Sequence, residues 1–311
     1  MRAPAPPSHP WIRAALAAAA PWAWFLVRDV GWIAEPFAVA FPLLAFVGLA
    51  LSATFAIVGR NRRTLLVTAS VLALALVVIL GPRRPAETAA PIDPFRVVSA
   101  NVFDGNRTPA SAARVLAGSD ADVLVAVETG EGFDELLAEA DHERPYEATG
   151  PDIVVRSRYP LRVLALPSSL PDRRSLRVLV ERPAGAVVLY AVHALNPAGE
   201  STFARQLDFV TRLSRAAQRE EQPAVIAGDF NMSDRELGYR RMTSAFRDAG
   251  RAGWAHDTYD RGFWRLLLLR IDYVFVEPSW CAADAERFTV PGSDHEGIAT
   301  TVGPCPGGPS A

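Results

Sequence analysis

Polar and ionisable side chains stand at the ends of short apolar runs from residue 95 onward in this 311-residue chain. Glu128 follows one run, His193 ends a second, and Asp229 follows a third. Side chains at strand ends gather on one rim of a sheet, where a rigid scaffold commonly holds catalytic groups. The full set, in which Asp272 lies inside its run, is Asn101, Glu128, His193, Asp229, Asn231, Asp272, Asp294 and His295.

These residue types indicate hydrolysis of a phosphate ester with the help of a divalent cation. Carboxylate and amide oxygens suit a hard ion such as Mg2+ or Mn2+, which keeps several of its waters when bound. An imidazolium group can stabilise charge on a phosphoryl oxygen or protonate a leaving group, and a carboxylate can orient the attacking water. We therefore expect the metal site and the hydrolytic centre in one pocket.

The runs that carry these residues alternate with helical patterns. Apolar residues at helical spacing after Ser201 predict a long amphipathic helix that this serine caps. Mixed strands and helices, with no glycine-rich phosphate loop, predict an α/β or α+β sandwich. Strands are predicted over residues 95–101, 122–127, 153–156, 176–181, 186–193, 224–228, 271–276 and 297–302, and shorter helices over 109–117 and 131–140.

Residues 1–84 are expected to form a membrane region with about three transmembrane helices. Residues 36–59 and 64–82 contain no charged side chain, and each stretch is about as long as a helix needs to cross a bilayer. Residues 14–27 are shorter, but tryptophans flank them as interfacial anchors do, and we predict a third span there. The alternative for that stretch is an uncleaved signal-like or interfacial helix.

The arginines of this region predict its orientation. Arg60, Arg62 and Arg63 form a basic turn between the second and third spans, which places that turn in the cytoplasm. Three spans then leave everything after Arg84 outside the cytoplasm, so the expected location is the cell membrane with an extracytoplasmic catalytic domain.

The remainder of the chain divides into a linker, a globular domain and a tail. Residues 85–94 are rich in proline and predict a semi-extended linker. The globular domain is expected over residues 95–303, followed by a flexible tail over 304–311. Cys281 and Cys305 lie in the exported part and are expected to form one structural disulfide, the alternative being two free thiols.

Composition and charge limit the possible functions. The chain is 50% hydrophobic and 21% charged, which excludes a disordered or low-complexity protein. Acidic residues outnumber basic ones after the linker. Because nonspecific nucleic-acid binding comes mainly from basic side chains on phosphates, this balance argues against a general nuclease.

Seven short motifs occur in a fixed order over most of residues 95–303. In this order they resemble the endonuclease/exonuclease/phosphatase superfamily. The resemblance implies a four-layer α/β sandwich of two packed mixed sheets. The motifs are SANV (99–102), VET (127–129), SRYPL (157–161), VHALNP (192–197), GDFN (228–231), RIDYVFV (270–276) and SDH (293–295).

The resemblance also implies which residues hold the metal ion. Glu128 would be the principal ligand of Mg2+ or Mn2+, with Asn101 beside it and Asp294 contributing to the same site. One position departs from the pattern: some nuclease branches carry an aspartate two residues after the asparagine of the first motif, where this chain has Phe103. The departure weakens the nuclease interpretation and any expectation of a second metal ion.

Catalytic roles follow from the resemblance in the same way. Asp229 would orient or deprotonate the attacking water, and Asn231 would hold a phosphate oxygen. His295 would contact the scissile phosphate, oriented by Asp272. His193 would be the second histidine, acting as a general acid or a phosphate ligand.

Three further residues are candidates for substrate binding. Phe263 and Trp264 precede the sixth motif and predict an apolar lip that admits a lipid chain, the alternative being the start of the buried strand. Arg158 is the third, with structural pairing to a carboxylate as its alternative. The architecture resembles the membrane-anchored teicoplanin-resistance branch, which implies dephosphorylation of a polyprenyl pyrophosphate carrier.

The sequence thus predicts a membrane-anchored, metal-dependent hydrolase of a phosphate or pyrophosphate ester, acting by water attack on a lipid-linked substrate. The expected partners are the bilayer and that lipid-linked phosphate, with nucleic acid less favoured and no obligate protein partner. One alternative is an exported nuclease, which a concentrated arginine groove around the pocket would distinguish. The other is a silent phospholipid-binding module, against which the complete acid and histidine set argues.

Overall fold

The protein divides into two compact units, Met1–Pro82 and Arg83–Ala311, and each is described here on its own. The structure is a computed structural model. Apart from a few scattered positions before residue 30, it describes residues 30–59, 62–80, 89–170, 175–253 and 257–307.

The first unit is built mainly from two consecutive apolar helices, α3 (Glu35–Gly59) and α4 (Arg62–Leu80), where the second and third spans are predicted. Among the described residues, one segment, Glu35–Thr54, is long and apolar enough to cross a membrane, as judged by length and composition. Most of the first predicted span, residues 14–27, lies outside the described residues, as does Arg60 of the basic turn.

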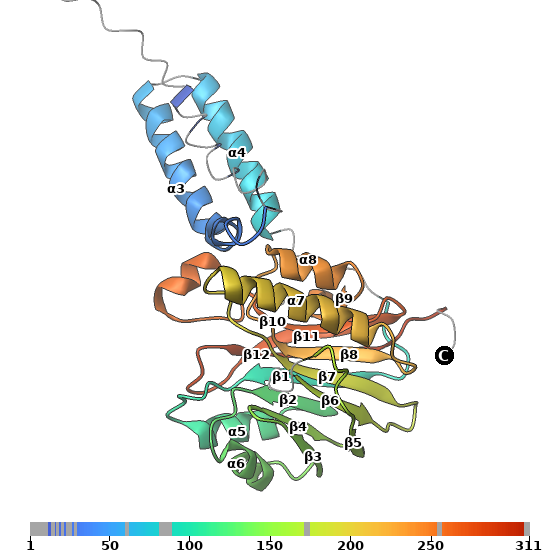
Figure 1. The fold of residues 1–311 in the computed structure, drawn as a ribbon. Helices are drawn as coiled ribbons and strands as arrows, with labels where there is room; N and C mark the ends of the chain where they lie inside the picture. Colours follow the sequence, from blue (N-terminus) through green and yellow to red (C-terminus); the bar gives the residue numbers. More distant parts are fainter. Residues whose placement is uncertain are drawn as a thin grey trace, which may run out of the picture. The chain divides into compact units, whose positions relative to one another are not determined.

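The second unit contains two six-stranded sheets (Figure 1). The strand order is β11-β12-β1-β2-β4-β3 in the first sheet and β5-β6-β7-β8-β10-β9 in the second. The strands are β1 (Phe95–Asn101), β2 (Val123–Val127), β3 (Tyr146–Thr149), β4 (Ile153–Ser157), β5 (Leu161–Val163), β6 (Ser175–Val180), β7 (Val187–His193), β8 (Ala224–Asp229), β9 (Arg247–Asp248), β10 (Asp272–Val276), β11 (Trp280–Thr289) and β12 (Glu296–Pro304).

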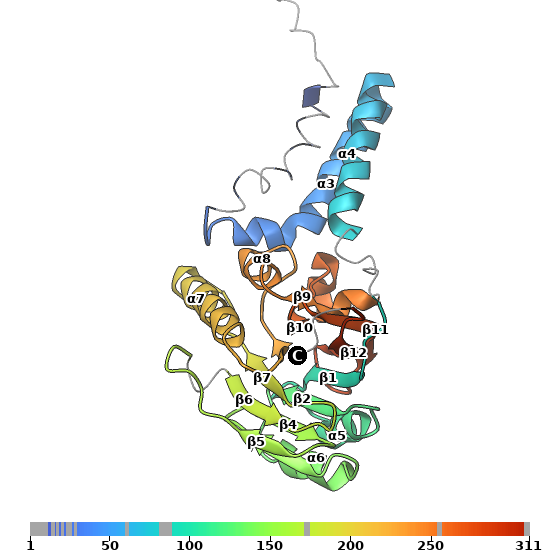
Figure 2. The same cartoon turned by 90° about the vertical axis from the view of Figure 1, so that its right-hand side faces the viewer.

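Helices cover the outer face of each sheet, which gives four layers (Figure 2). α5 (Pro109–Ala117) and α6 (Phe133–Ala140) pack on the first sheet, and α7 (Glu200–Ala217) and α8 (Leu237–Thr243) pack on the second. The space between the sheets is filled mostly by valine and alanine side chains. Because both sheets contain parallel and antiparallel pairs, the structure confirms the predicted sandwich of two packed mixed sheets.

The elements that the sequence pattern misses are short, exposed or charged. β3 and β5 are short edge strands without a clean alternation of apolar residues, and β11 carries charged residues and an irregular register between Ala283 and Glu286. The predicted cap of α7 is wrong: Ser201 lies inside the helix and Gly199 is the N-cap, where Thr202 Oγ1 accepts from the Gly199 N–H at 2.9 Å.

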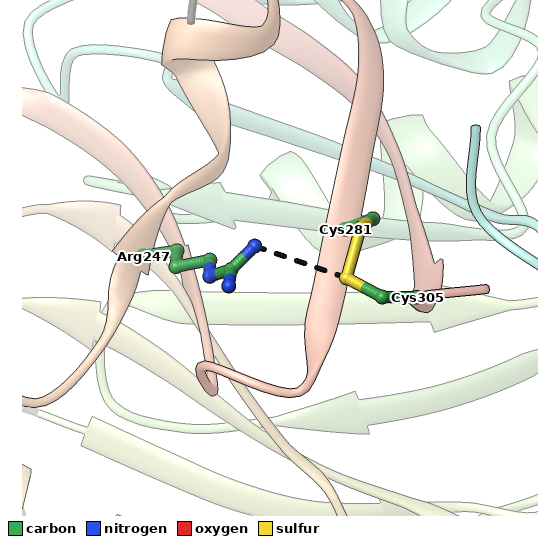
Figure 3. Close-up of a disulfide and its surroundings, with 3 residues drawn as sticks. All are labelled: Arg247, Cys281 and Cys305. Atoms are coloured by element: carbon green, nitrogen blue, oxygen red, sulfur yellow. Dashed lines mark hydrogen bonds between the residues drawn. A yellow bond between two sulfur atoms is a disulfide. The ribbon is translucent and has the colours of Figure 1, made fainter. Parts of the chain in front are cut away.

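The chain end is more ordered than the predicted tail. Pro304 is the last residue of β12, and Cys305 forms a disulfide with Cys281 at the start of β11 (Figure 3). Arg247 points its guanidinium toward the Cys305 sulfur in the same view. Pro304 and Cys305 therefore belong to the folded domain, and the expected disulfide is present.

Strand pairing brings the predicted site residues to one edge of each sheet. In the first sheet, parallel β1 and β2 place Asn101 beside Val127, the residue before Glu128. In the second sheet, parallel β7 and β8 place His193 beside Asp229, and antiparallel β10 starts at the same edge with Asp272 paired to Asp229. Parallel strands end at a common edge, so apolar runs that are far apart in sequence bring their polar ends together.

Gly228, one residue before Asp229, is required by this pairing. Its φ is +143°, and a Cβ there would lie 1.9 Å from the Val192 carbonyl oxygen of β7. Gly228→Ala should lower the free energy of unfolding by more than about 2 kcal/mol, because backbone strain and a collision add together. Urea unfolding of the purified protein measures this loss.

Gly185→Ala provides the matched control, since Gly185 has a φ of +120° but no atom within 4 Å of its added Cβ. It should cost only the strain, about 1 kcal/mol. Equal losses for the two variants would show that the approach of β7 to β8 does not require glycine.

Candidate active site

Asn101 lies at the centre of the predicted site residues. It ends β1 and is fully buried. Its Nδ2 donates to Glu128 Oε1 at 2.8 Å and to Asp229 Oδ2 at 3.1 Å, and lies 3.5 Å from His295 Nε2. Its Oδ1 accepts the Phe103 N–H at 2.9 Å. Asn101 therefore presents its amide nitrogen to both acids and orients them, and its predicted place beside the metal ion or the phosphate stays a prediction.

Glu128 follows β2 in a left-handed backbone conformation, with a φ of +52°. Burial raises the pKa of Glu128, but hydrogen bonds from His193 and Asn101 outweigh it and lower this pKa to about 2. The carboxylate is thus held ionised at the edge of the sheet, as a principal metal ligand must be.

His193 lies between two carboxylates. Its Nδ1 donates to Asp152 Oδ2 at 2.5 Å, and its Nε2 lies 3.2 Å from Glu128 Oε1. Burial lowers the pKa of His193, but the hydrogen bonds to Asp152 and Glu128 raise it to about 10. The ring is therefore an imidazolium at neutral pH, in the state that can stabilise a phosphoryl oxygen or donate a proton.

His295 is oriented in the same manner by Asp272. Its Nδ1 donates to Asp272 Oδ2 at 2.9 Å, as the predicted pair requires. The Ser293 hydroxyl accepts the His295 N–H and donates to the Asn101 carbonyl oxygen, which fixes the backbone of the last motif against β1. Burial lowers the pKa of His295, but the charge of Asp272 and its hydrogen bond raise it to about 9.

Asp229 is fully buried at the end of β8. Its Oδ1 accepts the Asn231 N–H at 2.7 Å, and its Oδ2 accepts Asn231 Nδ2 at 3.1 Å. Burial and the neighbouring charge of Asp272 raise the pKa of Asp229 to about 6, the range that suits a general base. Gln206 of α7 donates to the Asn231 carbonyl oxygen and thereby holds this turn in place.

The donor set fits a divalent cation. Oxygen or nitrogen atoms of Glu128, His193 and Asp229 lie within 4.8 Å of one another, and the same is true of Asp229, Asp272 and His295. Asp272 Oδ1 is buried and has no hydrogen-bond partner among the described residues. Carboxylate oxygens are the ligands that Mg2+ and Mn2+ prefer, so Glu128 would hold the ion, with the Asp229 carboxylate within 4.8 Å of the Glu128 carboxylate.

Two predicted site residues are directed elsewhere. The Asp294 carboxylate pairs with Arg261 Nη1 at 3.1 Å, and it is absent from the groups of acids and histidines described above. Its predicted contribution to the metal site stays a prediction, and its charge also acts on the neighbouring His295.

Arg158 lies at the opposite end of the first sheet from the site. Its backbone N–H donates to the Asp122 carbonyl oxygen, just before β2 begins, whereas Glu128 follows the other end of β2. Its guanidinium pairs with Asp120 at 3.0 Å and with Glu143 at 2.7 Å. The predicted substrate-binding role is therefore wrong, and the alternative of structural pairing is correct.

Phe263 and Trp264 lie in a short 3-10 helix, η4 (Gly262–Leu267), rather than in the strand that follows. Their exposed fractions are 61% and 48%, and Leu266 beside them is 56% exposed. The helix follows Tyr259, whose ring packs edge-on against His295 with centroids 5.1 Å apart. The two aromatic side chains are thus exposed within a few residues of the site.

Asp152 is the site residue that sequence reasoning missed. It directly precedes β4, which runs antiparallel to β2 with Ile153 paired to Val127. A residue that begins an antiparallel strand lies at the same edge as one that ends its partner, so the acid before the apolar run of β4 was the available signal. Thr258 also supports the site, because its hydroxyl accepts the Asp272 N–H at 3.1 Å.

The fold and this cluster of acids and histidines define a class, the two-sheet phosphoester hydrolases. The chain belongs to the Endonuclease/Exonuclease/phosphatase family, whose sequence model matches residues 98–295. This membership confirms the predicted superfamily and the predicted enzyme class, a metal-dependent hydrolase of phosphoester bonds. A search of curated proteins found no match.

Solved structures share the fold at low sequence identity. An endonuclease/exonuclease/phosphatase from Beutenbergia cavernae has a TM-score of 0.56 and 22% identity, covering 70% of this chain and 73% of that one. Sphingomyelinase C from Streptomyces griseocarneus has a TM-score of 0.52 and 18% identity, covering 68% and 99%. A D. rerio TDP2 humanized by 14 mutations has a TM-score of 0.52 and 19% identity, covering 67% and 98%.

Asp229→Ala should lower kcat for bis(4-nitrophenyl) phosphate with Mg2+ by about 10²- to 10⁴-fold, the usual contribution of a general acid or base. Asp229 is the carboxylate whose raised pKa suits it to accept a proton from the attacking water. Asp208→Ala, which removes an exposed carboxylate of α7 paired with Arg212, is the control and should leave kcat unchanged. A folded Asp229→Ala variant with kcat near that of the parent protein would refute the assignment.

Proposed function

We propose that this protein is a membrane-anchored phosphoesterase that hydrolyses a lipid-linked phosphate or pyrophosphate by attack of water. The observation that carries the proposal is the joint placement of two groups of residues. Ionised Glu128 and protonated His193 and His295 gather at one edge of the sandwich, and exposed Phe263 and Trp264 follow within the adjoining segment.

The residues divide the work of phosphoryl hydrolysis between them. Asp229, with its raised pKa, accepts a proton from the attacking water or orients it. His295, held by Asp272, donates to a non-bridging oxygen of the scissile phosphate, and His193 stabilises charge or protonates the leaving oxygen. Glu128 would hold a Mg2+ or Mn2+ ion, which would supply positive charge to the phosphoryl oxygens and the leaving group.

The apolar lip supports a lipid substrate over a soluble one. Phe263, Trp264 and Leu266 form a small exposed hydrophobic cluster on η4. Exposed apolar side chains at the rim of a polar pocket mark a surface that binds an apolar group. The excess of acidic over basic residues in the domain supports a lipid phosphate rather than a nucleic acid as the substrate.

Replacing Phe263 and Trp264 together by serine should lower kcat/KM for a micellar lipid phosphate by about ten- to thirtyfold, because two partly buried aromatic contacts are lost. Turnover of soluble bis(4-nitrophenyl) phosphate should be unchanged. Val163→Ser is the control, since Val163 is 59% exposed but lies on the edge strand β5. Equal losses on both substrates would contradict a lipid-binding lip.

Membrane anchoring and orientation complete the proposal. The apolar segment Glu35–Thr54 supports an anchor, and the predicted spans place residues after Arg84 outside the cytoplasm. The same arrangement supports a place in the membrane-anchored branch of the family and a polyprenyl pyrophosphate-like substrate in the same bilayer.

The topology has a direct test in spheroplasts of a bacterium that expresses the full chain. An epitope tag after the last residue should be removed by added proteinase K, and a tag before Met1 should be protected, because three spans put the two ends on opposite sides. Both tags should sediment with membranes after a carbonate wash. Protection of the carboxyl-terminal tag would refute the extracytoplasmic location.

A further inference from the structure

Arg261 carries a positive charge two residues after Tyr259, whose ring packs against His295. Its Nη1 donates to Asp294 Oδ2 at 3.1 Å, and its guanidinium carbon lies 5.5 Å from the centre of the Phe103 ring. The Asp294 side chain is only 14% exposed, whereas that of Arg261 is 61% exposed. A buried acid and an aromatic ring thus hold the guanidinium, and most of the side chain still faces solvent.

This arginine is connected to the catalytic histidine through short contacts. Asp294 directly precedes His295, and the Asp260 N–H donates to the Asp294 carbonyl oxygen at 2.8 Å. Tyr259 pairs with His295 in an isolated bridge and packs its ring against the imidazole. The segment 259–261 therefore lies along His295, and Arg261 is its outermost member.

The site and the segment beside it present three kinds of chemical group in order. His295 contacts the scissile phosphate in the proposed mechanism, Arg261 belongs to the segment that lies along His295, and the exposed Phe263 and Trp264 follow two and three residues after Arg261. A ligand that matched this order would carry a terminal phosphate, a second anionic group beside it, and then an apolar chain. A lipid diphosphate has these three parts in this order.

We propose that Arg261 binds the non-scissile phosphate of a lipid diphosphate and makes the site prefer diphosphates to monophosphates of the same lipid. This inference rests on the proposed function. The water oxygen forms a bond to the terminal phosphorus, the bond from that phosphorus to the bridging oxygen breaks, and inorganic phosphate and the lipid monophosphate leave. A planar guanidinium can donate two hydrogen bonds to the phosphate that remains on the lipid.

The test compares farnesyl diphosphate with farnesyl monophosphate, which share one alkyl chain, using the full protein in detergent with Mg2+. Arg261→Ala should lower kcat/KM for the diphosphate by about ten- to a hundredfold, the range for loss of a charge-assisted hydrogen bond. It should change kcat/KM for the monophosphate by less than about threefold. Arg265→Ala is the control, because Arg265 is an exposed arginine of the same short helix that pairs with Asp260, and it should leave both values unchanged.

A binding measurement separates this inference from the proposed function. Calorimetric titration with methylenediphosphonate, a non-hydrolysable P–C–P analogue, should show weaker binding to Arg261→Ala than to the parent protein, with phosphate binding unchanged. Equal loss of turnover on both farnesyl substrates, or unchanged methylenediphosphonate binding, would overturn the role of Arg261. A parent protein that cleaves nitrophenyl esters but neither farnesyl substrate would instead refute the lipid substrate, and the titration would still decide the role of Arg261.

Discussion

The contacts that assemble the site cross from one sheet to the other. Asn101, which ends a strand of the first sheet, binds Asp229 of the second, and Asp152, before β4 of the first sheet, binds His193 of the second. Packed sheets lie about 10 Å apart, a separation set by the side chains between them. In this domain those side chains are mostly valine and alanine, so the geometry of the acid and histidine pairs depends on a core that contains no catalytic residue.

The site stays charged although it is buried because opposite charges are held within hydrogen-bonding distance. Glu128 and His193 shift their pKa values in opposite directions, to about 2 and about 10, and each shift has the other residue among its causes. Breaking such a pair leaves an uncompensated charge in a poorly hydrated place. This costs more free energy than the intact pair contributes to stability. The pairs are thus arranged before substrate arrives, so little reorganisation is needed when charge develops on a phosphoryl oxygen.

The fold and most of the site could be predicted from the sequence because buried strands are continuous apolar runs whose polar ends are easy to see. Asn101, Glu128, His193, Asp229 and His295 all follow this pattern and come together. The prediction that failed depended on the direction of a strand and not on the place of that strand in the sequence. Arg158 follows β4, which runs antiparallel to β2, and so lies at the far edge. A local sequence motif does not specify which way a side chain points or in which direction its strand runs.

The balance of charge at the site favours a bound cation beside a phosphate group. The carboxylates of Glu128, Asp152, Asp229 and Asp272 surround two histidines, so even with both imidazoles protonated the acids are in excess. The Arg261–Asp294 pair adds no net charge, although the guanidinium is the member of the pair that faces solvent. An anionic substrate would be repelled from such a pocket, and a bound divalent ion offsets the excess. A bound divalent ion would therefore assist substrate binding as well as the chemical step that follows.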